Sequence, residues 1–294
     1  MGAPFNSAGI TGGVANAPMR LREAGLLNAL RARRADVRDL GDVDVGPPRR
    51  FRDPESGLLT QESLIAATTS VHAAVVACLA AGEFPLVLGG DCAVLLGALR
   101  GAQDALCDAA LVFVDGHEDA WPPHRSATGR AADCELGLAL SGADGLPAEL
   151  SVRVPTLDPT RIVALGPRDD MELRSAGVAS IGSTIALLPD RDLRGKAAVP
   201  TDIAVGRFHR RGVAWWLHVD LDVLSAEAMP AVDYPQPGGL DWPDLTAITA
   251  AATRSGCAGM TSTTYNPDLD ADGRHARRIV GYLADVLSVT PEMA

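Results

Sequence analysis

The sequence predicts a single α/β domain of three layers, in which a mostly parallel sheet lies between two layers of helices. Two runs, 110–114 and 214–219, are almost continuously apolar, as strands covered on both faces are. Strand, loop and helix patterns also alternate along the chain, an order typical of parallel strands joined by crossover helices. No linker-like break divides the 294 residues, so we expect one domain over 1–294.

The first elements are a strand and loop over 1–17 and a helix over 18–30, which has Pro18 in its first turn. A polar connection over 36–59 leads to a helix over 61–81. The remaining predicted elements are strand 85–88, helix 93–100, strand 110–114, helix 134–140, strand 161–165, strand 214–219, helix 242–254, strand 258–264 and helix 274–287.

The composition argues against several kinds of partner. The formal net charge is -11 and the sequence pI is about 4.9, whereas nucleic acids and anionic membranes are bound by clustered Lys and Arg. The five cysteines are odd in number and form no CxxC pair, which indicates thiols in a reducing compartment. No uninterrupted apolar run reaches the roughly 18 residues of a membrane span, and the N-terminus lacks a leader pattern. We therefore expect a cytoplasmic protein with no nucleic-acid or membrane partner.

Acids and imidazoles follow the two apolar strands at every second residue. Asp115, His117 and Asp119 come directly after strand 110–114, and His218, Asp220 and Asp222 end the strand over 214–219. In extended backbone this spacing puts each set on one side of the chain. Because ligands of open α/β sheets bind beyond the carboxyl ends of the strands, the two sets predict one metal-binding crevice.

These motifs, in this order, resemble those of the arginase and agmatinase (ureohydrolase) family. Gly89-Gly-Asp-Cys92 resembles the family's GGDH, residues 115–119 its DAHxD, and residues 218–222 its SxDxD; residues 13–26 and 229–239 resemble its opening and rim segments. The resemblance implies an arginase-like fold, a small-molecule substrate and a homo-oligomer, either trimer or hexamer. It also implies that a hydroxide bridging two Mn²⁺ ions attacks a guanidinium carbon.

The resemblance assigns six ligands to the two ions. Asp115 and Asp220 would bridge both ions, one ion would add Cys92 and Asp119, and the other would add His117 and Asp222. Cys92 stands where the family has His, and a thiolate favours Zn²⁺ or Fe²⁺ over Mn²⁺, so both one and two bound ions remain open. A buried core thiol is the other interpretation of Cys92.

Three further departures concern the substrate. Ala132 falls where arginases have their proton-shuttling His, and Thr264 falls where the family's EVNP has Glu. In the segment that resembles GxRDxD, the second Asp is displaced to Asp170. A guanidinium left against Thr264 would lose a charge-assisted hydrogen bond worth roughly 1.5 to 3 kcal/mol. We therefore expect a modified guanidine or a related substrate rather than plain arginine or agmatine.

The remaining roles follow from position. Asp119 or His124, which lies in the loop after the first motif, is expected to accept a proton, and His218 to orient an aspartate. Asp170, Asp233 and Thr264 are expected to bind substrate. Two other functions stay open: a mononuclear amide hydrolase that resembles deacetylases, and a catalytically silent relative with a binding or regulatory role.

Overall fold

The structure, a computed structural model, describes residues 1–33, 36–141, 146–254 and 256–288. Its centre is a sheet of seven strands that are parallel in every pair, in the order β1-β2-β7-β6-β3-β4-β5. The strands are β1 (Gly2–Ala3), β2 (Leu86–Gly89), β3 (Ala110–Val114), β4 (Ile162–Gly166), β5 (Ala186–Pro189), β6 (Trp215–Asp220) and β7 (Cys257–Thr263). The predicted parallel sheet is confirmed.

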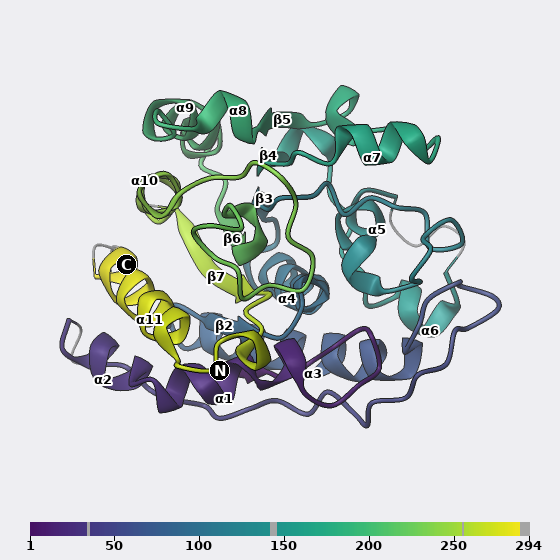
Figure 1. Ribbon diagram of the computed structural model, residues 1–294, viewed down its shortest axis with the longest axis horizontal. Coiled ribbons are helices and arrows are strands. Elements are labelled where there is room, and N and C mark those ends of the chain that lie inside the picture. Colours follow the sequence, from purple (N-terminus) through teal and green to yellow (C-terminus); the bar gives the residue numbers. More distant parts are fainter. Residues whose placement is uncertain (34–35, 142–145, 255, 289–294) are drawn as a thin grey trace.

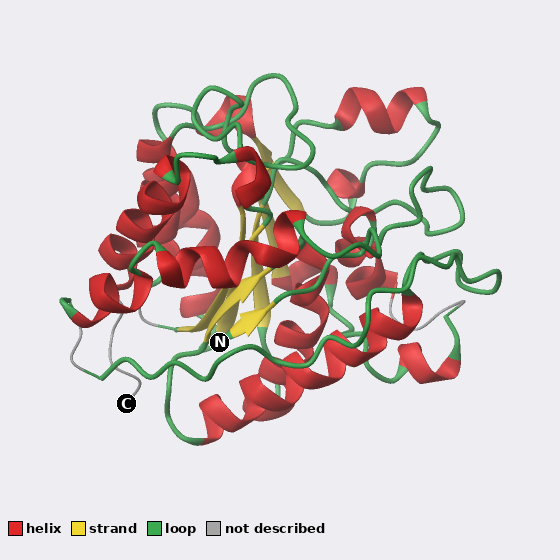
Figure 2. Ribbon diagram, turned by 60° about the horizontal axis from the view of Figure 1, so that its bottom comes forward, coloured by secondary structure: helices red, strands yellow, loops and turns green. Residues whose placement is uncertain are grey.

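Helices cover both faces of the sheet, which gives the predicted three layers (Figures 1 and 2). One face carries α1 (Ala17–Glu23), α2 (Leu26–Arg31), α9 (Ala198–His209), α10 (Trp242–Ala252) and α11 (Arg274–Leu287); the other carries α3 (Gln61–Ala80), α4 (Leu95–Leu106), α5 (Glu135–Ser141) and α6 (Ala148–Ser151). Short elements complete the chain: α7 (Asp170–Ser175), α8 (Asp190–Leu193), and the 3-10 helices η1 (Gly13–Asn16), η2 (Cys92–Val94), η3 (Ala131–Asp133), η4 (Pro159–Arg161), η5 (Ile181–Ser183), η6 (Leu221–Val223) and η7 (Pro267–Leu269).

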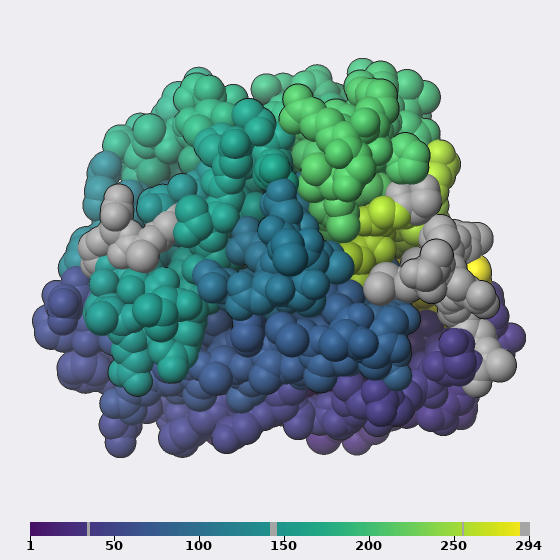
Figure 3. Space-filling model, turned by 180° about the vertical axis from the view of Figure 1, so that it is seen from behind, coloured from purple at the N-terminus to yellow at the C-terminus, as the bar shows by residue number. Residues whose placement is uncertain are grey.

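Alternate residues of each central strand pack into two separate cores, one on each face. In β3, Val112 and Val114 face the core beneath α10 and α11, whereas Leu111 and Phe113 face the core beneath α3 and α4. All of these side chains are buried, which explains why the strand is continuously apolar in sequence. Seen from behind, the first half of the chain forms the lower part of the surface, in purple and blue (Figure 3).

Two sequence predictions about local structure need correction. The helix expected over 18–30 is two helices, α1 and α2, because Gly25 between them adopts a left-handed conformation with φ of 93°. The sequence reasoning also missed β5 and α9. β5 is an edge strand of four half-buried residues, too short for a periodic signal.

Helix α3 is the single described helix that is long and apolar enough to cross a membrane. It packs along α4 inside the domain, where the absence of side chains at Gly97 and Gly101 allows close approach. A Cβ atom on Gly97 would lie 2.6 Å from the carbonyl oxygen of Thr68, and one on Gly101 would lie 3.0 Å from that of His72. This packing is typical of a core helix.

Candidate metal centre

The predicted ligands come from the carboxyl ends of neighbouring strands. Cys92 follows β2, Asp115 and Asp119 follow β3, and Asp220 ends β6. Because these strands lie in the order β2-β7-β6-β3, motifs more than a hundred residues apart in sequence meet at one edge of the sheet. They surround a cavity of about 200 Å³, which is lined by, among others, Cys92, His117, Asp119, Asp222 and Thr264. A larger cavity, of about 450 Å³, lies beside Phe84 and Pro85 at the amino end of β2 and is lined by none of these residues.

One ligand group contains Asp115, His117 and Asp222, each of which offers one ligand atom within 4.8 Å of the others. His117 Nδ1 lies 3.1 Å from Asp222 Oδ2 and 3.5 Å from Asp115 Oδ1. Within the described part of the chain, Asp115 Oδ2 and His117 Nε2 are buried without a hydrogen-bond partner. Unpaired buried polar atoms are costly, so this group is suited to hold a cation.

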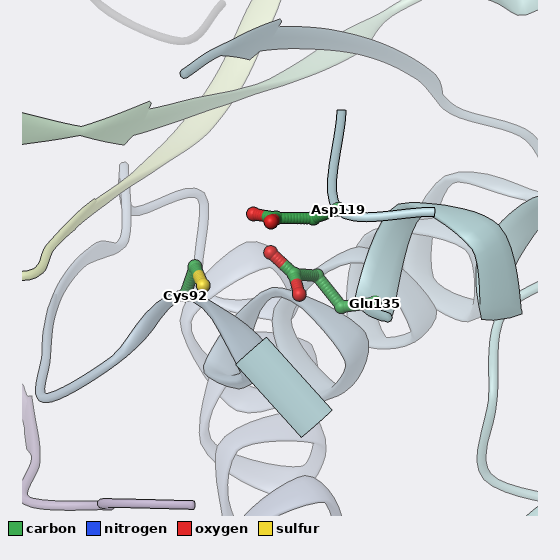
Figure 4. A group of neighbouring side chains, drawn as sticks. All are labelled: Cys92, Asp119 and Glu135. Carbon is green, nitrogen blue, oxygen red and sulfur yellow. The ribbon is translucent and has the colours of Figure 1, made fainter. Parts of the chain in front are cut away.

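A second group contains Cys92, Asp119 and Glu135, again within 4.8 Å of one another (Figure 4). Cys92 opens η2 after Asp91, which caps that turn by accepting from Ala93 N. Asp119 has a φ of 42°, a left-handed conformation that is uncommon for a residue with a side chain. Glu135 begins α5 and was not predicted as a site residue.

His218 belongs to a third group, with Asp115 and Glu135. Its ring stacks on Phe113 at a centroid distance of 5.2 Å, and its Nδ1 lies 2.6 Å from Thr261 Oγ1. Complete burial lowers the pKa of His218 to about 3, so the ring is neutral. Its Nε2 has no partner among the described residues. The ring therefore presents a free nitrogen to the site.

Asp220 lies beside these groups but belongs to none of them. Its Oδ1 accepts from Asp222 N at 2.8 Å, and its Oδ2 accepts from Thr263 Oγ1 at 3.0 Å and from Thr264 Oγ1. Thr264 has a φ of 66°, and this left-handed turn at the end of β7 aims its hydroxyl at Asp220. The hydroxyls of β7 thus hold the carboxylate that the family resemblance assigns to both ions.

Burial and mutual repulsion dominate the electrostatics of the site. Burial, followed by the charge of Asp222, raises the pKa of Asp115 to about 7. Burial and neighbouring carboxylates also raise the pKa of Asp119, Glu135 and Asp220 well above the usual range. Burial opposes a charge on His117, but the carboxylates of Asp222 and Asp115 together outweigh it and raise the pKa of the imidazole. Buried carboxylates crowded in this way repel one another unless a positive charge lies between them. The oxygen, nitrogen and sulfur atoms of the site are suitable ligands for a divalent metal ion.

Two of the residues predicted to bind substrate or accept a proton, Asp170 and His124, do not line the cavity. Asp170 is the first residue of α7 and pairs with Arg174 at 2.5 Å, while Asp169 and Glu172 line the cavity instead. His124 is exposed, and its Nε2 lies 2.9 Å from the carbonyl oxygen of Glu55. The start of α7 determines where the side chain of Asp170 points, and the path of the loop after Asp119 determines where that of His124 points. A sequence motif predicts neither.

Two of the residues expected to bind substrate line the cavity. Asp233 and Thr264 line the cavity together with Tyr234, whose ring is 5.6 Å from that of His117. The sequence reasoning missed Glu135, although one signal was available. Glu135 is the first residue of a short apolar helix, and this helix follows the loop after the metal motif. A charged residue in such an apolar helix is expected at the surface unless it has a specific partner, and Glu135 is buried.

A parallel α/β sheet with buried acids, an imidazole and a thiol at its carboxyl edge is typical of α/β proteins that bind a ligand or metal ion there. A family model described as the arginase family matches residues 1–288. Arginase-1 of Oryctolagus cuniculus is 27% identical over 290 residues, which cover 95% of this chain and 88% of that protein. An arginase structure from Bacillus caldovelox superposes with a TM-score of 0.82 at 25% identity, covering 97% of this chain and 96% of that one. An agmatine ureohydrolase structure from Thermoplasma volcanium shares the fold, with a TM-score of 0.67 at 20% identity over 98% of this chain and 87% of that one.

The chain therefore belongs to the arginase family. Members of this family are metal-dependent hydrolases of C–N bonds and use a binuclear Mn²⁺ site. The three ligand groups of this chain contain buried atoms without a hydrogen-bond partner among the described residues, and such atoms suit bound cations. The coarse prediction made from the sequence motifs, an arginase-like fold in a divergent member of the family, is confirmed.

Proposed function

We propose that this protein is a metal-dependent hydrolase that cleaves a C–N bond in a modified guanidine or a related cationic small molecule. The observation that carries the proposal is an acidic cavity with the two ligand groups of Cys92 and His117 at its wall. When bound, Mn²⁺ or a similar divalent ion would lower the pKa of water and stabilise the negative charge that develops during hydrolysis. Asp115, His117 and Asp222 would hold one ion.

A cationic substrate follows from the side chains around the opening. Beyond the ligand groups, the described lining includes five carboxylates and one guanidinium; these residues are Asp91, Asp133, Asp169, Glu172, Asp233 and Arg130. Glu172 Oε2 accepts from Gln236 Nε2 at 2.8 Å and its Oε1 accepts from Tyr234 at 3.3 Å. Fixed carboxylates at a cavity mouth attract and orient a cation, so Glu172 and Asp233 would bind the end of the substrate that does not react.

Thr264 supports a modified guanidine. Its hydroxyl is already committed to Asp220, so the end of β7 offers no carboxylate to pair with a full guanidinium. A substrate whose guanidine carries a substituent, or whose reacting carbon bears less positive charge, would not need that pairing. Plain arginine and agmatine would lose roughly 1.5 to 3 kcal/mol there.

Asp119 is the proton acceptor in this proposal. It lines the cavity and belongs to the ligand group of Cys92, so one of its carboxylate oxygens can contact the ion while the other accepts a proton. His124 is left out because its ring contacts Glu55 outside the cavity. We also propose, from the cysteine pattern and composition, that the protein is cytoplasmic and, from the family resemblance, that it assembles into a homo-oligomer.

The test is a substrate screen with Mn²⁺-loaded protein. Plain arginine, agmatine, N-hydroxylated and N-alkylated guanidines, and N-acetylated amines are compared, with release of urea, amine or acetate measured. Turnover of a substituted guanidine in excess of arginine supports the proposal, provided that His117→Asn abolishes it. Preferred turnover of arginine or of acetylated amines would overturn the substrate class, and full activity of Asp119→Asn would remove the proposed proton acceptor.

A further inference from the structure

Glu135 is a completely buried carboxylate at the meeting point of two ligand groups. It is 0% exposed, and it lies within 4.8 Å of ligand atoms of Cys92 and Asp119 and, in the other group, of Asp115 and His218. Figure 4 shows its carboxylate directed from the start of α5 into the space between Cys92 and Asp119. No other glutamate of the described chain joins a ligand group.

Neither oxygen of this carboxylate has a hydrogen-bond partner within the described residues. Glu118, the other buried glutamate, differs: its oxygens accept from Ser180 Oγ at 2.6 Å and from Ile181 N at 2.7 Å. A buried carboxylate normally has such donors, because an unsatisfied one costs several kcal/mol. The donor set around Glu135 consists of a thiol, further carboxylates and a free imidazole nitrogen, and such a set is completed by a metal ion.

We propose that Glu135 is a metal ligand, and that with Cys92 and Asp119 it forms a sulfur-and-oxygen position that favours Zn²⁺ or Co²⁺ over Mn²⁺. The sulfur of Cys92 makes this position softer than the all-oxygen-and-nitrogen group at His117. Glu135 supplies the negative charge and the third donor that Cys92 and Asp119 lack alone. The site would thus hold two different ions, a softer one at Glu135 and a harder one at His117. This inference names the metals of the proposed hydrolase and so builds on that function.

Metal binding, rather than turnover, tests the inference. Chelator-treated protein is titrated with Co²⁺, and the sulfur-to-cobalt charge-transfer absorption reports coordination by Cys92. We expect wild type to develop this band and Cys92→Ser to lack it. Glu135→Gln, which keeps the shape but removes the charge, should weaken the Co²⁺ affinity reported by the band by about tenfold or more. Mn²⁺ binding to the group at His117, followed by electron paramagnetic resonance, should change much less.

Asp244→Asn is the matched control for loss of a buried carboxylate. Asp244 lies in α10, where both of its oxygens accept from Gly195 N, and it belongs to no ligand group. Its variant should bind Co²⁺ as wild type does. An unchanged Co²⁺ band and affinity in a folded Glu135→Gln protein would overturn the inference.

A second measurement needs no variant, in case Glu135→Gln does not fold. Anomalous diffraction from wild-type crystals loaded with Zn²⁺ should show an ion about 2.3 Å from Cys92 Sγ and about 2.0 to 2.2 Å from a Glu135 oxygen. An ion placed without Glu135, or no ion near Cys92, would overturn the inference. Because neither experiment measures turnover, an inactive protein that binds both metals as described would refute the proposed function alone.

Discussion

The hydroxyl of Thr264, at the end of β7, donates a hydrogen bond to Oδ2 of Asp220, at the end of the neighbouring strand β6. A residue that falls where the family resemblance places a guanidinium-binding acid therefore donates to the carboxylate that the resemblance assigns to the metal site. The bond depends on a left-handed backbone conformation at Thr264, with φ of 66°. One hydrogen bond thus links a residue proposed to bind substrate with a carboxylate proposed to bind metal.

We expect Thr264→Val to reduce the free energy of unfolding of the metal-free protein by about 1.5 to 3 kcal/mol, because it removes a hydrogen bond to a buried carboxyl group. Thr264→Ser keeps the hydroxyl and should lose less. Urea denaturation of both variants measures the difference. A larger loss in Thr264→Ser than in Thr264→Val would show that the methyl group, and not the hydroxyl, is important.

Arg168 holds the backbone of the segment that carries Asp222. Its guanidinium donates to the carbonyl oxygens of Asp222 at 2.7 Å and of Val223 at 3.3 Å. Arg168→Met should release this segment and weaken Mn²⁺ binding by about tenfold, as loss of a supporting contact commonly does. Arg125→Met is the control, because Arg125 also donates to two carbonyl oxygens, but these belong to Ala176 and Gly177, which are in no ligand group. Calorimetric titration with Mn²⁺ compares them, and equal affinities would contradict the role of Arg168.

Mn²⁺ affinity should fall as the pH is lowered from 8 to 6. Burial and the charge of Asp222 raise the pKa of Asp115 to about 7, so below that pH the metal-free protein holds a proton that the metal must displace. Each displaced proton weakens apparent binding by about tenfold per pH unit below its pKa. Titration calorimetry in buffers of different ionisation enthalpy counts the protons released, and a pH-independent affinity would be incompatible with this mechanism.

Glu172 and Asp170 allow a test of which acid faces the substrate. Glu172 lines the cavity, whereas Asp170 pairs with Arg174 outside it. With whichever cationic substrate the screen identifies, Glu172→Gln should raise KM with a smaller effect on kcat, because it weakens binding of the end that does not react. Asp170→Asn should leave both constants near wild type. The opposite pattern would restore the assignment of Asp170 made from its motif.

Close packing of α3 on α4 predicts a sharp difference between two glycines. Gly97→Ala should destabilise the protein by about 1 to 3 kcal/mol, because the new Cβ would meet Thr68 O at 2.6 Å. Gly281→Ala in α11 meets no atom within 4 Å and should stabilise the helix by about 0.5 to 1 kcal/mol. Thermal unfolding measures both, and a neutral Gly97→Ala would mean that the two helices separate at little cost.

The sequence by itself determined the sheet and the edge at which the site lies. Residues 110–114 and 215–220 are buried on both faces, so their apolar runs marked the central strands, and the acids that follow marked the carboxyl edge. Such signals are local, because a strand, its end and its motif are contiguous in the chain. The order of the motifs was enough to indicate the family.

Only the tertiary structure decided which side chains meet. Glu135 enters the site because α5 begins beneath the loop after β3, and no spacing in the sequence relates it to Cys92, 43 positions earlier. His124 and Asp170 lie outside the cavity because a loop path and a helix start turned them away. The direction of a side chain at a strand end depends on the packing of elements distant in the chain, and a local motif carries no record of that packing.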